Sequence, residues 1–157
     1  MKTLLFVDDD PSDRLLVEMG CRRAQVSFLL RTVESGVEAI RYLSGEGRFA
    51  DRVEHPLPDL IFLDLKMPEM DGFQVLRWIR GHPATRTTPV AVYSASFIPE
   101  DIAKSYSGGA DFFITKPSDL TGLVDVFRAA DKCLAADPWN GDALTPFTAP
   151  VGRAVLK

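Results

Sequence analysis

One short stretch near the start of the chain decides the fold: Thr3-Leu4-Leu5-Phe6-Val7-Asp8-Asp9-Asp10-Pro11. It opens with an apolar run that has no polar alternation, which is typical of a strand buried on both faces of a parallel sheet. Three carboxylates follow at once. Of these, Asp10 together with Pro11 fits the N-cap and the first position of a helix. The stretch therefore predicts a buried strand, an acidic loop and a helix, which is the repeating unit of an α/β protein.

The same unit recurs along the chain. Further apolar runs predict strands over residues 28–33, 60–63, 89–93 and 112–115. Helix-period segments lie between these runs, and we expect them to begin after Asp10, at Ser35–Gly36, at Asp71–Gly72, at Pro99 and at a capping Ser118. Such alternation forms a parallel sheet covered on both faces, with right-handed crossovers. We predict an α/β fold: a flavodoxin-like, doubly wound five-stranded parallel sheet of order 2-1-3-4-5 with five helices.

The length of the chain, 157 residues, suits one domain with some length to spare. We expect that domain to span residues 1–136. Beyond it, prolines and polar residues interrupt the helical pattern, and residues 137–157 are too few for a domain of their own. This tail is predicted to be either a disordered end or an arm that lies on the body of the protein or on a neighbouring molecule.

Composition excludes several classes of protein. The 18 Lys and Arg residues against 22 Asp and Glu give a net charge of -4, so the chain lacks the basic face of a nucleic-acid binder. No apolar run approaches the ~20 residues that a membrane span needs. The two histidines and two cysteines form no zinc cluster, and no glycine-rich phosphate loop is present. We expect a cytoplasmic protein with neither nucleic acid nor membrane as its partner.

Polar side chains gather where the predicted strands end. They are Asp8 and Asp9 after the first strand, Asp64 after the third, Ser94 after the fourth and Lys116 after the fifth. Ligands of open parallel sheets bind beyond these carboxyl ends, where the strand order reverses. The first and third strands are neighbours there, so we expect Asp9 and Asp64 to converge. Converging carboxylates are hard oxygen ligands that suit Mg²⁺.

The segment Phe62-Leu63-Asp64-Leu65-Lys66-Met67-Pro68-Glu69-Met70-Asp71-Gly72 resembles the phosphoacceptor segment of two-component response-regulator receiver domains. Two further landmarks of that family follow in order. Its Ser or Thr, about thirty residues past the acceptor, falls on Ser94. Its Lys-Pro pair, about twenty-two residues further on, falls on Lys116-Pro117. The resemblance extends from about Lys2 to Leu134.

This resemblance implies roles for the acidic residues. Asp64 would be the nucleophile that takes a phosphoryl group from a phosphohistidine and forms an acyl phosphate. Asp9 would bind Mg²⁺, Asp8 would hold a metal-bound water, and the backbone carbonyl of Lys66 would complete the protein's ligands together with Asp64. The protein would therefore be a phosphoacceptor and not an enzyme that turns over a substrate.

The resemblance also implies a switch. Lys116 would neutralise the phosphoryl group in flight, aimed by a cis Lys116-Pro117 peptide bond. Ser94 would bond a phosphoryl oxygen, and the aromatic Phe113 would then rotate inward and reshape the surface of the fourth and fifth helices. Many relatives have Tyr in place of Phe113, and its alternative role is that of an ordinary core residue.

Two positions are expected to tune the lifetime of the phosphoryl group. Lys66 and Ser96 lie two residues past the acceptor and past Ser94, where family members set the rate of attack by water. We hypothesise that the long Lys66 side chain shields the acyl phosphate and slows self-dephosphorylation.

Partners follow from the same resemblance. A histidine kinase or phosphotransfer protein would supply the phosphoryl group, and an effect on a downstream protein would be the output, since no DNA-binding domain or enzyme follows the receiver. The insertion over residues 45–58 is similar to that of receivers that partner bacterial phytochrome kinases. Such relatives often form homodimers through the face of the fourth and fifth helices or through a C-terminal arm, for which Trp139 and Phe147 are suited.

Two alternatives stay open on the sequence. Asp8-Asp9-Asp10 contains an Asp-x-Asp pattern, as in haloacid-dehalogenase-like Mg²⁺ phosphatases, although Ser12 stands where those enzymes have Thr or Val. The other alternative is a pseudo-receiver, an interaction module that is never phosphorylated. Labelling of Asp64 in a single turnover distinguishes the receiver from both.

Overall fold

The central sheet is parallel throughout. The computed structural model describes residues 1–151, and its strands are β1 (Thr3–Val7), β2 (Leu29–Val33), β3 (Leu60–Leu63), β4 (Val90–Ser94) and β5 (Phe112–Thr115). They are hydrogen-bonded in the order β2-β1-β3-β4-β5, so the predicted topology is confirmed. The register places Val7 of β1 beside Leu63 of β3. The chain therefore leaves these two strands at neighbouring points on one edge.

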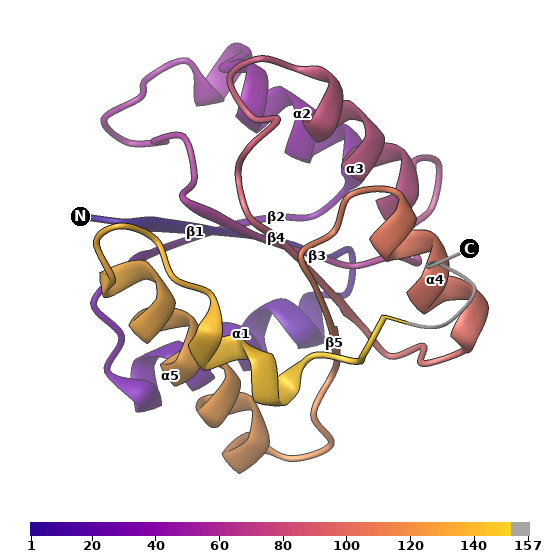
Figure 1. Ribbon diagram of the computed structural model, residues 1–157. Coiled ribbons are helices and arrows are strands. Elements are labelled where there is room, and N and C mark those ends of the chain that lie inside the picture. The colour runs from indigo at the N-terminus through magenta and orange to yellow at the C-terminus, as the bar shows by residue number, and fades with distance from the viewer. Residues whose placement is uncertain (152–157) are drawn as a thin grey trace.

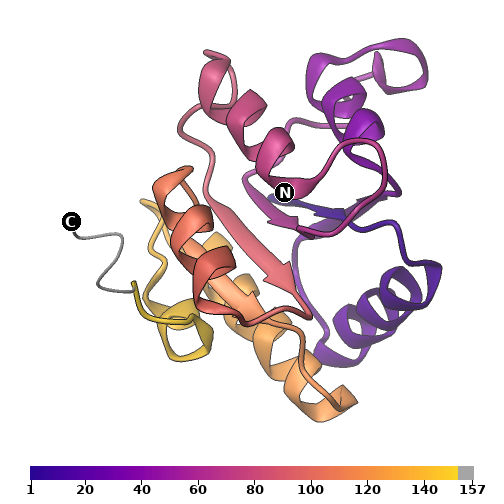
Figure 2. The same ribbon diagram turned by 90° about the vertical axis from the view of Figure 1, so that its right-hand side faces the viewer.

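Helices cover both faces of the sheet (Figures 1 and 2). They are α1 (Pro11–Ala24), α2 (Gly36–Ser44), α3 (Gly72–Gly81), α4 (Pro99–Ser107) and α5 (Leu120–Ala135), with two short 3₁₀ turns at Gly47–Phe49 and Asp142–Phe147. Figure 1 shows α1 and α5 on one side and α2, α3 and α4 on the other. No helix of residues 1–151 is both long and apolar enough to cross a membrane.

Strands β1, β3 and β4 are buried on both faces, which explains their nearly continuous apolar runs. Leu4 and Phe6 face the core under α1 and α5, where Phe6 stacks near Phe127 with ring centroids 6.5 Å apart. Leu5 and Val7 face the opposite core under α2 and α3. Apolar residues are thus needed from Leu4 to Val7, and the carboxylates come only after the strand has ended.

Side-chain caps fix where the helices begin. The Asp10 carboxylate accepts a hydrogen bond from the Ser12 amide at 2.8 Å, which confirms its predicted capping of α1. The prediction that Ser118 caps α5 is wrong. Asp119 does so, accepting from the Gly122 amide at 2.7 Å, because the helix begins one residue later than predicted and an aspartate caps as well as a serine.

The C-terminal arm, defined here as residues 137–151, folds back on the body of the protein. Its Leu144 is fully buried against α5, and the Ala149 amide donates to the Phe113 carbonyl at 2.7 Å. Thr148 forms an antiparallel bridge with Ile114, so the arm covers the outer edge of β5 (Figure 2). The alternative of a disordered end is therefore wrong for the arm, while residues 152–157 lie outside the described part of the chain.

Candidate functional site

Three carboxylates converge at the edge where β1 and β3 end. One oxygen from each of Asp8, Asp9 and Asp64 lies within 4.8 Å of the others, as the strand order predicts. Asp8 and Asp64 are buried, and Asp9 is half-buried. The Arg14 guanidinium donates to the Asp8 carbonyl at 2.8 Å and so anchors α1 to the acidic loop.

A single ammonium group compensates this charge. Lys116 Nζ lies 2.7 Å from Asp13 Oδ2, 2.9 Å from Asp8 Oδ2 and 3.7 Å from Asp64 Oδ2. Lys116 lies beside the carboxylates, as predicted, but Asp13 was not predicted to be part of the site. A signal was available, because Asp10 at the N-cap puts Asp13 in the first turn of α1, beside the end of β1.

The charge balance of the site shifts the pKa values of its groups. Burial raises the pKa of Asp64 to about 7, a shift that Lys116 opposes and Asp8 reinforces. Burial likewise raises the pKa of Asp8 above its usual range. For Lys116 burial alone would lower the pKa, but the nearby carboxylates of Asp13 and Asp8 outweigh this effect and raise the pKa. The acids outnumber the ammonium, so the site favours a further cation.

The donor set fits a hard divalent ion. Asp8 Oδ2 is buried and, although close to Lys116, accepts no hydrogen bond of good geometry from the described residues. Two oxygens on opposite sides of Mg²⁺ lie ~4.2 Å apart, since each ligand is ~2.1 Å from the ion. The three carboxylate oxygens lie within 4.8 Å of one another, which is a separation of that scale.

Ser94 and the two positions expected to tune the phosphoryl lifetime form a connected set. Ser94 is buried at the end of β4, and its Oγ accepts from the Ser96 amide at 3.1 Å. The Ser96 hydroxyl donates to Asp101 Oδ2 at 2.7 Å, and Lys66 Nζ lies 3.4 Å from the same oxygen. Asp101 belongs to the first turn of α4 and was missed, because its sequence position signals only a helix start.

The Lys66 side chain therefore points to α4. None of the ion pairs in residues 1–151 joins Lys66 to Asp64. The predicted use of the Lys66 backbone carbonyl as a ligand is a separate matter, and it stays a prediction.

Phe113 is an inward-facing core residue. Its ring is fully buried in the core on the side of α3 and α4, and its amide donates to Thr148 Oγ1 of the C-terminal arm at 2.8 Å. The ring already faces inward in this structure, and its rotation on phosphorylation stays a prediction. The alternative reading, an ordinary core residue, fits this structure.

The predicted cis Lys116-Pro117 bond is also wrong. Among residues 1–151 the cis peptide bond is Asp137-Pro138, and Lys116-Pro117 is trans. An X-Pro bond prefers trans by ~0.5–1 kcal/mol unless the surroundings demand otherwise. Here the contacts of Lys116 with Asp13 and Asp8 hold its ammonium group in place with the trans bond.

A glycine lets the loop after β3 pack on the acceptor. A Cβ atom at Gly72 would lie 2.3 Å from the backbone oxygen of Asp64, far inside van der Waals contact. The Gly72 amide meanwhile donates to the Leu65 carbonyl at 2.9 Å. The family-like Asp71-Gly72 pair therefore has a steric reason, since α3 begins directly against the backbone of the acceptor.

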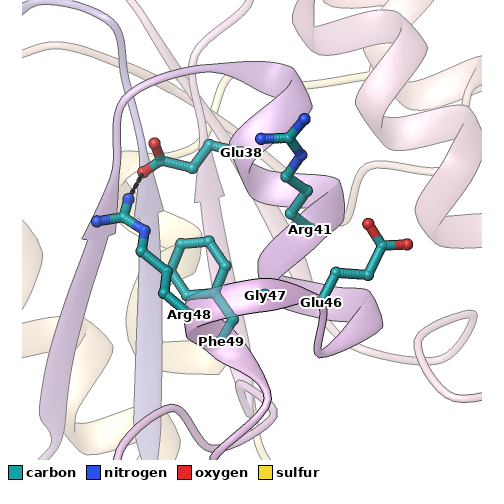
Figure 3. Close-up of a pocket in the computed structure, with 6 residues that line it drawn as sticks. All are labelled: Glu38, Arg41, Glu46, Gly47, Arg48 and Phe49. Atoms are coloured by element: carbon teal, nitrogen blue, oxygen red, sulfur yellow. Dashed lines mark ion pairs between the residues drawn. The ribbon is translucent and has the colours of Figure 1, made fainter.

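A surface hollow lies away from these residues (Figure 3). It is lined by residues of α2 and the following 3₁₀ turn, namely Glu38, Arg41, Glu46, Gly47, Arg48 and Phe49. Arg48 pairs with Glu38 at 2.8 Å and lies over the Phe49 ring. The charges of Arg48 and Glu38 are thus balanced within the hollow.

Known proteins with the same fold and similar sequence are signalling proteins. Response regulator Rcp1 of Synechocystis is 30% identical over 131 residues, covering 83% of this chain and 87% of its own. A structure of its Mn²⁺-bound form superimposes with a TM-score of 0.75, at 28% identity over 87% of this chain and 96% of that chain. Several other curated relatives are longer, and this chain spans about half of their length.

Two further structures are similar to this chain. Response regulator RPA3017, in red light signalling of R. palustris, has a TM-score of 0.77 at 33% identity, with 83% of this chain and 91% of that chain covered. The phosphorylated cyanobacterial phytochrome response regulator RcpA has a TM-score of 0.77 at 32% identity, with 87% and 95% covered. A model of the family described as response regulator receiver domain matches residues 4–128 of the sequence. The chain thus belongs to the response regulator receiver domain family of two-component signalling.

Proposed function

We propose that this receiver accepts a phosphoryl group from a histidine kinase, or from a phosphotransfer protein, on the carboxylate of Asp64 in a Mg²⁺-dependent reaction. The observation that carries the proposal is the convergence of Asp8, Asp9 and Asp64 on one sheet edge with the Lys116 ammonium beside them. A nucleophilic carboxylate, a cation site and a fixed ammonium are the parts that phosphoryl transfer requires.

The proposed transfer balances simply. A carboxylate oxygen of Asp64 attacks phosphorus, the P–N bond of the phosphohistidine breaks, and the imidazole leaves with the electron pair. Lys116 faces the charge that develops on the phosphoryl oxygens, and the Ser94 hydroxyl bonds one of them after transfer. The chemistry that Mg²⁺ supplies when held by Asp8, Asp9, Asp64 and the Lys66 carbonyl is neutralisation of that charge.

The output is a change in protein contacts. The acyl phosphate carries about -1.5 to -2 charges in place of the single charge of the Asp64 carboxylate, beside the loops that lead into α3 and α4. A downstream protein that reads these loops would sense phosphorylation without any turnover of a substrate. The phytochrome response regulators among the similar structures support a phytochrome-type kinase as the donor.

The proposal extends to the association of two copies of the chain. A homodimer through the face of α4 and α5 stays a prediction. Exchange of the C-terminal arm between two copies has less support, because Thr148 and Ala149 already pair with β5 of their own chain.

Phosphorylation of Asp64 can be tested with a small donor and with a kinase. Wild type incubated with acetyl phosphate and Mg²⁺ is expected to gain one phosphoryl group, seen by intact-mass spectrometry. Asp64→Asn is expected to gain none, Asp9→Asn to need more Mg²⁺, and Asp125→Asn, an exposed aspartate on α5, to match wild type. Unchanged labelling of Asp64→Asn contradicts the acceptor assignment, and multiple turnover of a phosphate ester contradicts the proposed class. A panel of kinases then identifies the donor.

A further inference from the structure

One carboxylate outside the acidic cluster connects three functional segments. Asp101 Oδ2 accepts from the Ser96 hydroxyl at 2.7 Å and lies 3.4 Å from Lys66 Nζ. Lys66 follows the acceptor by two residues, and Ser96 follows Ser94 by two. Asp101 itself lies in the first turn of α4. A single oxygen therefore links the acceptor loop, the loop after β4 and helix α4.

Lys66 and Asp101, the two partners of this ion pair, differ in how freely their side chains can move. The Lys66 side chain is 64% exposed, whereas that of Asp101 is 11% exposed. Asp101 is also fixed through its backbone, because its carbonyl accepts from the Ser105 hydroxyl at 2.7 Å. The lysine can thus change partner by rotating its long side chain in solvent, without any prior movement of the aspartate.

We propose that Asp101 is a positioning residue, which holds the Lys66 ammonium on α4 in the unphosphorylated protein and gives it up to the phosphoryl group on Asp64. The inference rests on the proposed function, since it needs phosphorylation at Asp64. It deepens that function by naming how the charge at Asp64 reaches α4.

Charge decides the exchange of partners. In the unphosphorylated protein the Asp64 carboxylate already has Lys116 at 3.7 Å, and Asp101 holds Lys66. A phosphoryl group carries more charge than the single charge of Asp101 and extends further from the backbone of residue 64. An exposed ion pair holds its ammonium weakly, so the phosphoryl group on Asp64 attracts Lys66 more strongly than Asp101 does.

Loss of Lys66 leaves the Asp101 carboxylate with the Ser96 hydroxyl as its side-chain partner within residues 1–151. Asp101 is buried, so its charge favours a more hydrated position, and the first turn of α4 loosens from the acceptor loop. This route from Asp64 to α4 does not pass through Phe113, whose ring is already fully buried.

The position of Lys66 also governs the lifetime of the phosphoryl group. While Asp101 competes for the ammonium, Lys66 covers the acyl phosphate for only part of the time. Removing the charge of Asp101 leaves Lys66 on the phosphoryl group, where it obstructs attack by water. The effect of Asp101 on the phosphoryl lifetime must then depend on Lys66. A purely structural role of Asp101 does not require this dependence.

The test is a double-mutant cycle on the decay of the phosphorylated protein. Asp101→Asn keeps the acceptor oxygen for Ser96 and is expected to slow hydrolysis by about threefold, the scale of one exposed ion pair. The same change in a Lys66→Met background is expected to have no effect. Asp111→Asn, which removes the surface pair with Arg80 at 3.0 Å, is the matched control and should leave decay unchanged.

A second readout follows α4 directly. Hydrogen exchange of the α4 amides is expected to speed up when beryllofluoride and Mg²⁺ are added to wild type, and to stay constant in Lys66→Met. That variant changes an exposed side chain, so it tests the proposal even where Asp101→Asn folds poorly. Equal effects of Asp101→Asn in both backgrounds, or an α4 response that persists in Lys66→Met, overturn the inference. Absence of any label on Asp64 in wild type overturns the proposed function instead.

Discussion

Lys116 Nζ lies 2.9 Å from Oδ2 of Asp8, a carboxylate that is fully buried at the end of β1. A buried charge without a partner is costly, so this contact links the stability of the fold to the parts of the site. The same ammonium also faces Asp13 and Asp64, and the site stays negative even with Lys116 in place.

Removal of the ammonium should therefore destabilise the protein. Lys116→Met is expected to lower the free energy of unfolding by ~3 kcal/mol at pH 7.5 without Mg²⁺, because it leaves Asp8 buried and unpaired. Urea denaturation measures this loss, and added Mg²⁺ should restore part of it. Lys104→Met, which removes an ammonium over the Phe73 ring on the surface, should cost far less. Equal losses in the two variants contradict the assignment.

The pKa of Asp64 gives the stability a definite pH dependence. Burial raises that pKa from the usual 3.8 to about 7, so between these values the folded protein binds more protons than the unfolded chain. Stability without Mg²⁺ should thus fall as the pH rises from 4 to 7.

The measurement is the free energy of unfolding of wild type minus that of Asp64→Asn across this range. The difference should decline with pH and level off above about 7. Saturating Mg²⁺ should flatten the decline, since a cation favours the ionised carboxylate. If the difference in unfolding free energy between the two proteins does not change with pH, the pKa of Asp64 is not raised.

Gly72 allows a sharp steric test of the acceptor loop. Gly72→Ala places a Cβ 2.3 Å from the Asp64 backbone oxygen, so the loop must move. We expect a loss of ~1–3 kcal/mol in stability, as for other overpacked sites, and a larger loss in the rate of Asp64 phosphorylation. Gly81→Ala is the matched control on the same helix, where nothing lies within 4 Å of the added Cβ. Normal phosphorylation of Gly72→Ala contradicts the steric argument.

Local patterns predicted most of the fold and the strand-end residues. The continuous apolar run of β1 identifies a strand buried on both faces, and the parallel order then brings Asp9 and Asp64 together. The capping of α1 could have placed Asp13 near the end of β1, but Asp101 was missed because its role depends on where α4 packs relative to Lys66. A side-chain contact between elements far apart in the chain has no periodic signal in the sequence.

One wrong prediction has a similar cause. The cis bond at Lys116-Pro117 came from the resemblance and not from this chain's own contacts. The carboxylates of Asp8 and Asp13 hold Lys116 with the trans bond, and the resemblance did not specify these contacts.

The C-terminal arm should contribute to stability through one buried side chain. Leu144 is fully buried beside α5, and its replacement by Ala is expected to cost ~2–5 kcal/mol because a cavity forms. The loosened arm should also release the Ala149 amide, which donates to the Phe113 carbonyl at 2.7 Å, so its hydrogen exchange should quicken. Urea denaturation and exchange measure the two effects, with Val53→Ala, at a side chain 90% exposed, as the control. A Leu144→Ala protein as stable as that control would mean that the arm is not part of the folded unit.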